Sequence, residues 1–464
     1  MSEVVSEVVD MRVAAEAVVG ALRRAGHEAY FAGGSVRDLV MSQTPHDYDI
    51  ATSARPEEVM ALFPRTVAVG LSFGVVIVLH GGHELEVATF RADGAYVDGR
   101  HPTSVRFSSA AEDVARRDFT INGLLYDPET GQVVDHVGGQ ADIAARLVRC
   151  IGDPMARFGE DRLRMIRAVR FAVRFDFEMD PATWEALCRL APAIGKVSAE
   201  RIRDELLKML TGPTPDRALR LLDASGLLAE ILPEVAACKG VDQPPDYHPE
   251  GDVFEHTARA LAALEPPPTQ GRQGWETEAL WLATLLHDVG KPPTMTVTDR
   301  IHFKGHAAVG ARLAEGICRR LRLSTHHVQR THDLVAAHMR FLDVRRMRKA
   351  KRIRFLRLDY IDDLLALHRA DRLAGEGDLG QYDYCRAHLA DLAPDQLRPP
   401  ALLDGHDLQK RGVAPGPRLG ALLRDLEDAQ LDGEVTTRTE AEAWLAHRLA
   451  VDDAEPHDVE PKES

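Results

Sequence analysis

The sequence has no hydrophobic run long enough to cross a membrane as a helix. Its longest useful apolar runs, Ala279–Leu286 and Val75–Leu79, fall far short of the roughly 20 residues that a membrane helix needs. The first residues include Glu3, Glu7 and Asp10 and lack the basic and apolar segments of a secretory signal. We therefore expect a cytoplasmic protein with no membrane partner.

Cysteine is sparse, and the chain carries no excess of positive charge. Its five cysteines are scattered among 464 residues, and no two have CxxC spacing, which excludes a small disulfide-linked scaffold and is typical of a reduced cytosol. The 57 lysines and arginines face 72 aspartates and glutamates, a net charge of −15. Any nucleic-acid surface must therefore be local.

Strand and helix patterns divide the chain. Valine-rich strands bounded by glycine recur up to about residue 150, and amphipathic helices follow from Pro154 onward. We predict an α+β fold, with a small mixed sheet in an N-terminal head followed by all-α segments. The predicted domains are a head (1–150), a helical neck and body (151–240), a helical domain with tail helices (241–450) and an acidic disordered tail (451–464).

Two aspartates follow a glycine turn near the N-terminus. Asp47 and Asp49 are two residues apart in a predicted strand, so their side chains share one face. Like charges this close favour a bound cation, and carboxylate oxygens suit Mg²⁺. The turn Gly33-Gly34 precedes a predicted helix whose free N–H groups can hold phosphate oxygens. Taken alone, the same residues also fit a tight turn and two solvated acids.

These segments resemble the signature of the class II tRNA nucleotidyltransferase and bacterial poly(A) polymerase family. The resemblance rests on five motifs that occur in the expected order: Gly33-Gly34-Ser35-Val36-Arg37-Asp38, Asp47-Tyr48-Asp49-Ile50-Ala51-Thr52, Glu86-Val87-Ala88-Thr89-Phe90-Arg91, Arg116-Arg117-Asp118-Phe119-Thr120-Ile121-Asn122, and Glu160-Asp161-Arg162-Leu163-Arg164. A further motif, Glu200–Leu206, also matches. For the last motif, in the family's neck helix, we expect a structural role.

The resemblance implies a catalytic site. Asp47 and Asp49 would bind Mg²⁺ while an RNA 3′-hydroxyl attacks the α-phosphate of a nucleotide in line. Glu86 is the preferred third carboxylate, although Glu84 shares its face. The implied nucleotide-binding residues are Gly33, Gly34, Arg37, Arg116, Arg117, Asp118, Asn122, Asp161, Arg164 and Arg167.

Some of these residues also have ordinary structural interpretations. Asp118 could cap a helix and leave Asn122 on the surface, and Asp161 and Arg164 could form a helical salt bridge three residues apart. The resemblance instead implies that Asp161 accepts from the exocyclic amine of cytosine or adenine while Arg164 donates to the adjacent ring nitrogen.

The implied activity is addition of the 3′-terminal CCA to the acceptor end of tRNA from CTP and ATP. The segment Val69–Val76 resembles the CCA-adding pattern, and the loop Ala92–Ser104 resembles an element that helps to switch from C to A. Poly(A) synthesis, partial addition of CC or A, and a catalytically dead RNA-binding protein remain alternatives.

A histidine-rich array in the C-terminal half resembles the HD phosphohydrolase superfamily. The resemblance implies four metal ligands, His256, His287, Asp288 and Asp371, among which His302, His306, His332 and His338 are interspersed. Such ligands suit Mn²⁺, Ni²⁺, Fe²⁺ or Zn²⁺. The proline-rich segment 265–274 lies between His256 and His287, so it is predicted to be an inserted loop. A degenerate HD domain that supports tRNA is the alternative.

A basic segment interrupts the acidic chain. Residues 345–357 contain eight lysines or arginines and no acid. A solvated helix face is the ordinary explanation, but we predict contact with tRNA phosphates. The predicted RNA-binding residues are Arg345, Arg346, Arg348, Lys349, Lys351 and Arg352. The sequence leaves the oligomeric state open.

Overall fold

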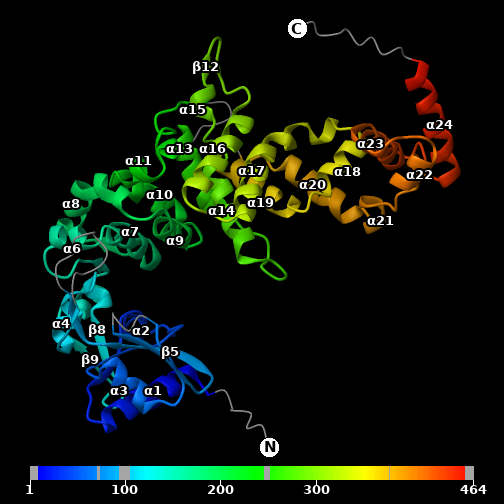
Figure 1. Ribbon diagram of the computed structural model, residues 1–464. Coiled ribbons are helices and arrows are strands. Elements are labelled where there is room, and N and C mark those ends of the chain that lie inside the picture. The colour runs from blue at the N-terminus through cyan, green and yellow to red at the C-terminus, as the bar shows by residue number, and fades with distance from the viewer. Residues whose placement is uncertain (1–8, 70–73, 94–104, 245–250, 376, 455–464) are drawn as a thin grey trace, which may run out of the picture. The chain divides into compact units, whose positions relative to one another are not determined.

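The computed structural model describes residues 9–69, 74–93, 105–244, 251–375 and 377–454 (Figure 1). The chain divides into two compact units, Met1–Gly240 with Gly316–Thr325, and Val241–Glu315 with His326–Ser464. Most of the predicted C-to-A switching loop, the centre of the CCA-type pattern and most of the predicted disordered tail lie outside the described residues.

A mixed β-sheet forms the N-terminal part of the first unit, and helices follow it, which confirms the predicted α+β class. The sheet has seven strands in the order β3-β4-β5-β2-β1-β8-β9, and β2 and β5 run parallel whereas the other pairs are antiparallel. Its strands are β1 (Ala29–Ala32), β2 (Asp49–Thr52), β3 (Thr66–Val67), β4 (Val75–His80), β5 (His83–Thr89), β8 (Leu124–Asp127) and β9 (Gln132–Asp135).

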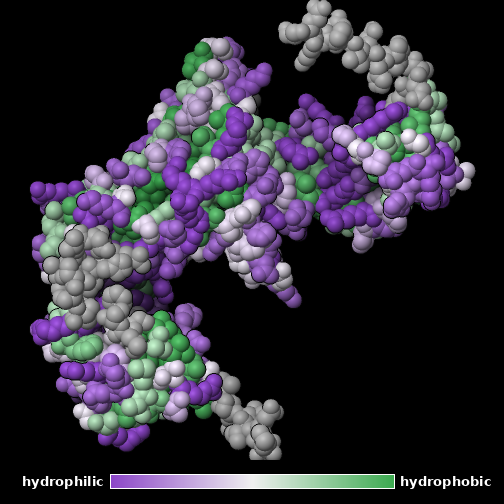
Figure 2. All heavy atoms as spheres, viewed as in Figure 1, coloured by the Kyte–Doolittle hydropathy of each residue, from purple (hydrophilic) through white to green (hydrophobic). Residues whose placement is uncertain are grey.

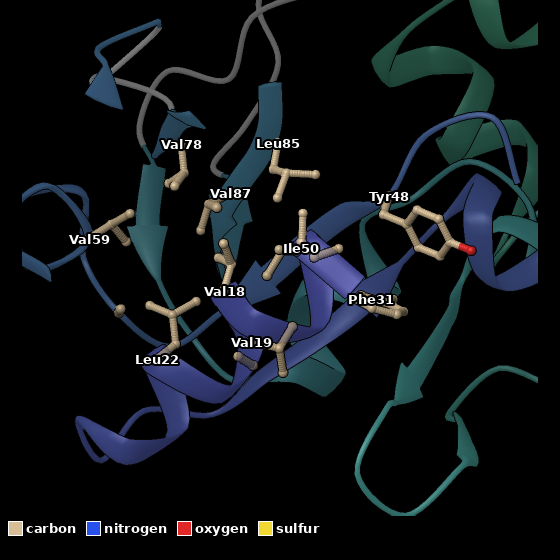
Figure 3. Close-up of a cluster of buried hydrophobic side chains, with 14 of the residues drawn as sticks. Val18, Val19, Leu22, Phe31, Tyr48, Ile50, Val59, Val78, Leu85 and Val87 are labelled. Atoms are coloured by element: carbon tan, nitrogen blue, oxygen red, sulfur yellow. The ribbon is translucent and has the colours of Figure 1, made fainter. Parts of the chain in front are cut away.

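Helices α1 (Met11–Arg24) and α3 (Pro56–Leu62) pack on the sheet and enclose its apolar core (Figure 3). Val18, Val19 and Leu22 lie on one side of α1 because they recur at helical spacing, and all three are fully buried. They meet the alternating inward side chains of the strands, among them Ile50 and Val87. The outward positions of the same strands remain available for polar side chains.

A glycine turn connects β1 to helix α2 (Gly34–Val40). Gly33 has φ 71° and ψ −126°, a conformation that is strained for residues with a Cβ. Because β1 ends at Ala32, its ladder with β2 ends at the pair Ala32–Asp49. Asp47 therefore lies just before β2. The sequence pattern had predicted that it lies within the strand, and this prediction is wrong.

Strands β6 (Arg91–Asp93) and β7 (Val105–Phe107) form a separate antiparallel pair in the first unit. The rest of this unit is mainly helical, with the two-residue strands β10 (Leu147–Val148) and β11 (Glu178–Met179). Its longer helices are α6 (Pro154–Glu160), α7 (Leu163–Phe175), α8 (Pro181–Leu190), α9 (Ala199–Leu210) and α10 (Pro215–Ala224). The predicted continuous helix through Asp161 and Arg164 is wrong. The helix is interrupted at Asp161 and Arg162, which lie between α6 and α7. The Asp161 carboxylate accepts a hydrogen bond from the N–H of Leu163, the first residue of α7, at 3.1 Å.

The second unit is predominantly helical. Its main elements are α13 (Val253–Ala263), α14 (Gly274–Leu286), the first part of α16 (His306–Arg320), α17 (Thr325–Ala337), the 3₁₀ helix η4 (His338–Arg346), α18 (Lys349–Leu356), α19 (Ile361–Ala374), α20 (Gly380–Asp391), α23 (Pro417–Asp432) and α24 (Arg438–Ala454). Within the described ranges, no helix combines the length and hydrophobicity that a membrane span requires. Hydrophilic side chains cover most of the face in Figure 2.

Leu22 offers a test of the head core. We expect Leu22→Ala to lower the opening free energy of the head strands by about 2 to 5 kcal/mol, because it leaves a cavity between α1 and the sheet. Hydrogen exchange of the β1 and β2 amides, read by mass spectrometry, measures this locally. Leu62→Ala, on a helix and 39% exposed, is the matched control and should shift it by no more than about 0.5 kcal/mol. Equal effects of the two variants would contradict the assigned core.

Candidate active site and metal centre

A cavity of about 620 Å³ in the first unit collects most of the predicted site residues. It is bordered by the glycine turn, the start of β2, the segment after α4 (Ala110–Ala115), and helices α7 and α9. Asp47 and Asp49 line it, together with all ten predicted nucleotide-binding residues: Gly33, Gly34, Arg37, Arg116, Arg117, Asp118, Asn122, Asp161, Arg164 and Arg167. A loop, a strand end and a helix far apart in sequence thus meet here.

Glu86 lies beside Asp49 because of the strand register. β5 pairs with β2 in parallel, with Val87 opposite Ile50, so the preceding residues of both strands, Glu86 and Asp49, are neighbours. Both side chains line a smaller cavity of about 260 Å³. Glu84, the alternative carboxylate, is paired with Leu79 at the far end of β5.

The carboxylates repel one another. Loss of water around Asp49 raises its pKa to about 6, and the negative charges of Glu86 and Asp47 add to this rise, whereas Arg117 opposes it. Oxygen donors crowded on one side of a sheet have the chemistry that Mg²⁺ prefers. A divalent ion would remove the repulsion.

The paired arginines of the third motif are held by an acid that the sequence interpretation missed. Arg116 Nη2 and Arg117 Nη2 lie 2.6 and 3.0 Å from the two carboxylate oxygens of buried Asp113. Burial alone would raise the pKa of Asp113, but the two guanidinium groups hold it below its usual value. Asp113 lies one turn before the arginines on α4, so helical spacing was the available signal.

Asp118 and Asn122 do not adopt the helix-cap arrangement that was considered from the sequence. Asn122 is buried and belongs to a short 3₁₀ turn that begins without a side-chain cap. Its amide donates to Asp118 at 3.1 Å. Arg167 binds the other Asp118 oxygen through Nε and Nη2 at 2.8 and 2.6 Å.

Arg37 is buried beneath the cavity. Its guanidinium donates to Asp38 at 2.7 Å and to the Asn122 side-chain oxygen at 2.6 Å, and it lies 4.4 Å from the centre of the Phe175 ring. Burial lowers the pKa of Arg37, and the nearby charges of Arg174 and Arg170 add to this effect. Crowded guanidinium groups at one wall favour an anionic ligand.

The salt bridge between Asp161 and Arg164, which was the alternative interpretation of these residues, is absent from the described contacts. Asp161 instead binds Arg201 on α9, with Nη2 at 2.7 Å. Arg164 donates to Glu160 at 2.7 Å and to the Arg116 carbonyl at 3.0 Å. Separate partners therefore hold the two predicted base-reading groups at the cavity, and neither Glu160 nor Arg201 had been assigned to it.

The second unit contains a buried cluster that includes all four predicted HD ligands. His256 on α13 lies 3.0 Å from Asp371 on α19, and His287 follows α14. The His287 Nδ1 is 2.8 Å from the Thr284 carbonyl, which assigns its proton to Nδ1. Its buried Nε2 has no hydrogen-bond partner within the described chain and faces the other ligands as a lone pair.

Asp288 connects this group to a second triad that the sequence interpretation did not assign. Its Oδ2 lies 3.3 Å from His287, whereas its Oδ1 lies 3.6 and 3.9 Å from His306 and His338. The two groups of possible ligands are His256, His287 and Asp371, and Asp288, His306 and His338. Lys291 binds the Asp288 carboxylate at 2.7 Å.

The two histidines of the second triad face each other through nitrogens without protons. Their Nδ1 atoms lie 2.9 and 2.7 Å from the carbonyls of Phe303 and Val335, so each Nδ1 carries the proton. The Nε2 atoms of His306 and His338 are then two lone pairs 3.2 Å apart. This arrangement fits a shared metal ion. Burial lowers the pKa of His338 to about 4.

A cavity of about 810 Å³ is lined by all three residues of the second triad and by Asp371 of the first. Cationic Arg300, Lys304 and Arg372 line it, together with apolar residues that include Phe303 and Leu342. His302 also borders the cavity but belongs to neither triad, and His332 instead contacts Asp333 at 3.0 Å.

The basic segment splits into two groups. Arg354 and Arg357 are bound by Glu427 on α23 at 2.9 and 2.7 Å, so they hold the fold together. Of the predicted RNA-binding residues, Arg345 and Arg352 lie over the Tyr384 ring. The other four are exposed without an ion pair in the described chain: Arg346, Arg348, Lys349 and Lys351.

Three family models match the chain. Residues 29–149 match the poly A polymerase head domain, and residues 176–239 match a probable RNA and SrmB-binding site of polymerase A. Residues 254–375 match the HD domain. The matches cover the head with its carboxylates, part of the helical region after it, and the histidine cluster.

Curated relatives and solved structures agree with these matches. A CCA-adding enzyme of Geobacillus thermodenitrificans is 48% identical over 47% of this chain and 54% of its own length. The structure of the Bacillus stearothermophilus CCA-adding enzyme in complex with CTP is 28% identical, with a TM-score of 0.69 over 96% of this chain and 99% of that one. The Thermotoga maritima CCA-adding enzyme complexed with tRNA shares the fold, with a TM-score of 0.62 at 18% identity over 96% of this chain and 97% of that one.

A relative of nearly full length decides the family. The CCA-adding enzyme of Levilactobacillus brevis is 35% identical over 424 residues, which are 91% of this chain and 94% of the relative. Together with the head-domain and HD-domain matches, this shows that the chain belongs to the CCA-adding enzymes, a family of tRNA nucleotidyltransferases.

Proposed function

We propose that this enzyme builds or repairs the complete 3′-terminal CCA of tRNA from CTP and ATP without a nucleic-acid template. The observation that carries the proposal is the convergence of Asp47, Asp49 and Glu86 beside a cavity walled by arginines. Relatives named CCA-adding enzymes and neighbouring structures of such enzymes with CTP, ATP or tRNA support the substrates.

The carboxylates position the chemical step. Bound Mg²⁺ would lower the pKa of the RNA 3′-hydroxyl and neutralise the departing pyrophosphate. Asp47 and Asp49 are the proposed ligands, and Glu86 the third carboxylate. Because the sheet fixes the backbone of Asp49 and Glu86, the enzyme holds these groups before the substrate arrives, which favours in-line attack on the α-phosphate.

The guanidinium groups and the glycine turn bind the nucleotide. Gly33 and Gly34 let phosphate oxygens approach the backbone, and a side chain at Gly33 would come 3.2 Å from Arg117 Nη1. Arg37, Arg116, Arg117 and Arg167 neutralise the triphosphate from the cavity wall, and Asp118 and Asn122 orient the ribose.

Asp161 and Arg164 read the base. Cytosine and adenine both present an exocyclic amine, which donates to the Asp161 carboxylate, beside a ring nitrogen that accepts from Arg164. Uracil and guanine present a carbonyl at the amine position, where it would meet carboxylate oxygens. Amino-acid side chains thereby replace a nucleic-acid template in the choice of nucleotide.

Removal of a ligand carboxylate should stop extension. We expect Asp49→Asn and Glu86→Gln to slow nucleotide addition by about 100-fold or more while tRNA binding persists, because the metal-dependent step is lost. The assay extends tRNAs that end before CCA, after CC and after CCA, with each nucleotide alone and together, and sizes the products.

The same extension assay includes a control variant and outcomes that would contradict the proposal. Glu84→Gln alters a carboxylate on the same strand, away from Asp49, and should extend normally. Wild-type products should stop at CCA. Long adenylate tails would favour a poly(A) polymerase, arrest after CC or addition of A alone would favour a partial enzyme, and no growth would favour an inactive RNA-binding protein.

For the HD domain, we propose a metal-dependent phosphohydrolase with two adjacent divalent ions. The observation that carries it is the pair of buried triads on either side of Asp288, with imidazole lone pairs directed inward. Imidazole and carboxylate ligands suit Mn²⁺, Ni²⁺, Fe²⁺ or Zn²⁺. Lys291, Arg300, Lys304 and Arg372 supply positive charge for a phosphate ester in the adjoining cavity.

Metal stoichiometry tests this second activity. We expect the wild type, loaded with Mn²⁺ and dialysed, to retain about two ions per chain in this domain and His338→Ala about one, because one triad loses a ligand. Elemental analysis of a variant that also carries Asp47→Asn and Asp49→Asn excludes ions in the head. His332→Ala, outside both triads, is the control. Absence of bound metal and of p-nitrophenyl phosphate hydrolysis in the wild type would instead support a degenerate HD domain.

We also propose that the basic segment contacts tRNA phosphates near the acceptor end. Arg346, Arg348, Lys349 and Lys351 are exposed and have no acidic partner within the described chain, although the chain as a whole is acidic. Arg345 and Arg352 extend this group beside Tyr384. Positive side chains left without acids suit a polyanion.

Salt dependence distinguishes phosphate contact from a solvated face. Replacing the four exposed residues by Gln should weaken tRNA binding most at low salt and reduce the slope of log K against log salt by about 0.7 to 0.9 per lost contact. Binding is measured by filter retention over a salt series. Lys410→Gln, an exposed charge on α22 (Gly405–Lys410), is the control. Unchanged affinity of the fourfold variant at low salt would contradict the contact.

A further inference from the structure

Arg201 grips the proposed base-reading carboxylate from a separate helix. It lies near the start of α9, forty residues after Asp161, and both side chains line the nucleotide cavity. Its Nη1 and Nη2 donate to the two oxygens of Asp161 at 3.2 and 2.7 Å, a fork that meets both oxygens at once. The sequence assigned this helix a structural role only.

The contacts of Asp161 leave little of its accepting capacity unused. A carboxylate has about four lone-pair positions. The described chain uses three of them, since the Leu163 N–H donates to Oδ1 in addition to the two Arg201 bonds. About one position remains for a donor in the cavity, which matches the single N–H that an exocyclic amine directs at a neighbour.

The ion pair also determines what the cavity does not offer. A guanidinium that faced the base without a partner would donate to the carbonyl of uracil or guanine and so favour binding of UTP or GTP. Engaged with Asp161, Arg201 spends two donors on the carboxylate. It holds the acceptor in one orientation and removes a competing donor.

We propose that Arg201 is a positioning residue that sets the preference for cytosine and adenine by holding Asp161 as an acceptor in a fixed orientation. The inference rests on the proposed reading of the base by Asp161. It concerns nucleotide choice and not the chemical step, because the structure brings Arg201 to Asp161 and not to the carboxylates of β2 and β5.

Helix α9 contains a matched control. Arg203 lies two residues beyond Arg201 but does not line the cavity. It donates instead to Asp204 at 2.8 Å and to the Arg322 carbonyl at 2.7 Å. The same helix also holds Arg170 of α7, because Glu205 binds it. A general weakening of α9 would therefore disturb other contacts as well, and both Arg201 and Arg203 substitutions would report it.

The experiment measures nucleotide selectivity on two tRNAs. The ratio of kcat/KM for CTP over UTP is determined on a tRNA that ends before CCA, and the ratio for ATP over GTP on one that ends in CC. We expect Arg201→Gln to lower both ratios by about tenfold or more, the scale of one lost bidentate base contact. Arg201→Lys, which restores the charge without the fork, should recover part of the loss. Arg203→Gln should leave both ratios at the wild-type values.

The outcomes separate this inference from the proposal on which it rests. Equal ratios in Arg201→Gln and wild type, with lowered selectivity in Asp161→Ala, would overturn the role of Arg201 alone. Unchanged selectivity in Asp161→Ala as well would overturn base reading by Asp161. A uniform fall in rate or melting temperature for Arg201→Gln, with both ratios intact, would show a merely structural residue and also overturn the inference.

Discussion

Electrostatic repulsion among Asp47, Asp49 and Glu86 is the constraint around which the head is organised. The parallel register of β2 and β5 makes Asp49 and Glu86 neighbours, and the end of β1 at the glycine turn leaves Asp47 just outside the ladder. Among the residues that the structure describes, no cationic side chain pairs directly with these acids, and the pKa of Asp49 remains raised to about 6 although Arg117 opposes the rise. The apolar core beneath the strands fixes their backbones, so that the carboxylates stay close together although they repel one another. This arrangement of acids can bind a cation.

The arginines around these carboxylates are held by ion pairs with other acidic side chains. Arg116 and Arg117 share Asp113, Arg167 binds Asp118, and Arg201 binds Asp161. Each pair fixes a planar donor group at the cavity wall and lowers the cost of placing several positive charges together. The acids in these pairs thus hold in place the arginines that line the cavity.

The sequence predicted the fold class correctly, and the predicted nucleotide-binding residues lie together at one cavity, because both depend on local patterns. Alternation located the strands, and ordered motifs located the acids. It could not choose between Glu86 and Glu84 by geometry, since period two treats them alike and only the partner strand distinguishes them. It also missed Arg201, because the contact of this residue with Asp161 joins segments forty residues apart. It did not predict the helix break at Asp161, because helix propensity does not reveal that the Asp161 carboxylate accepts a hydrogen bond at the start of α7. His306 and His338 were visible as histidines, but their hydrogen bonds to the carbonyls of Phe303 and Val335 depend on the folded backbone.

The two oxygens of Asp288 face different triads, and this single side chain links their occupancy. An ion held by His256, His287 and Asp371 would orient the carboxylate, and its other oxygen would then be preset toward His306 and His338. The charge and orientation of one carboxylate would therefore serve both positions, so that filling one position would change the affinity of the other.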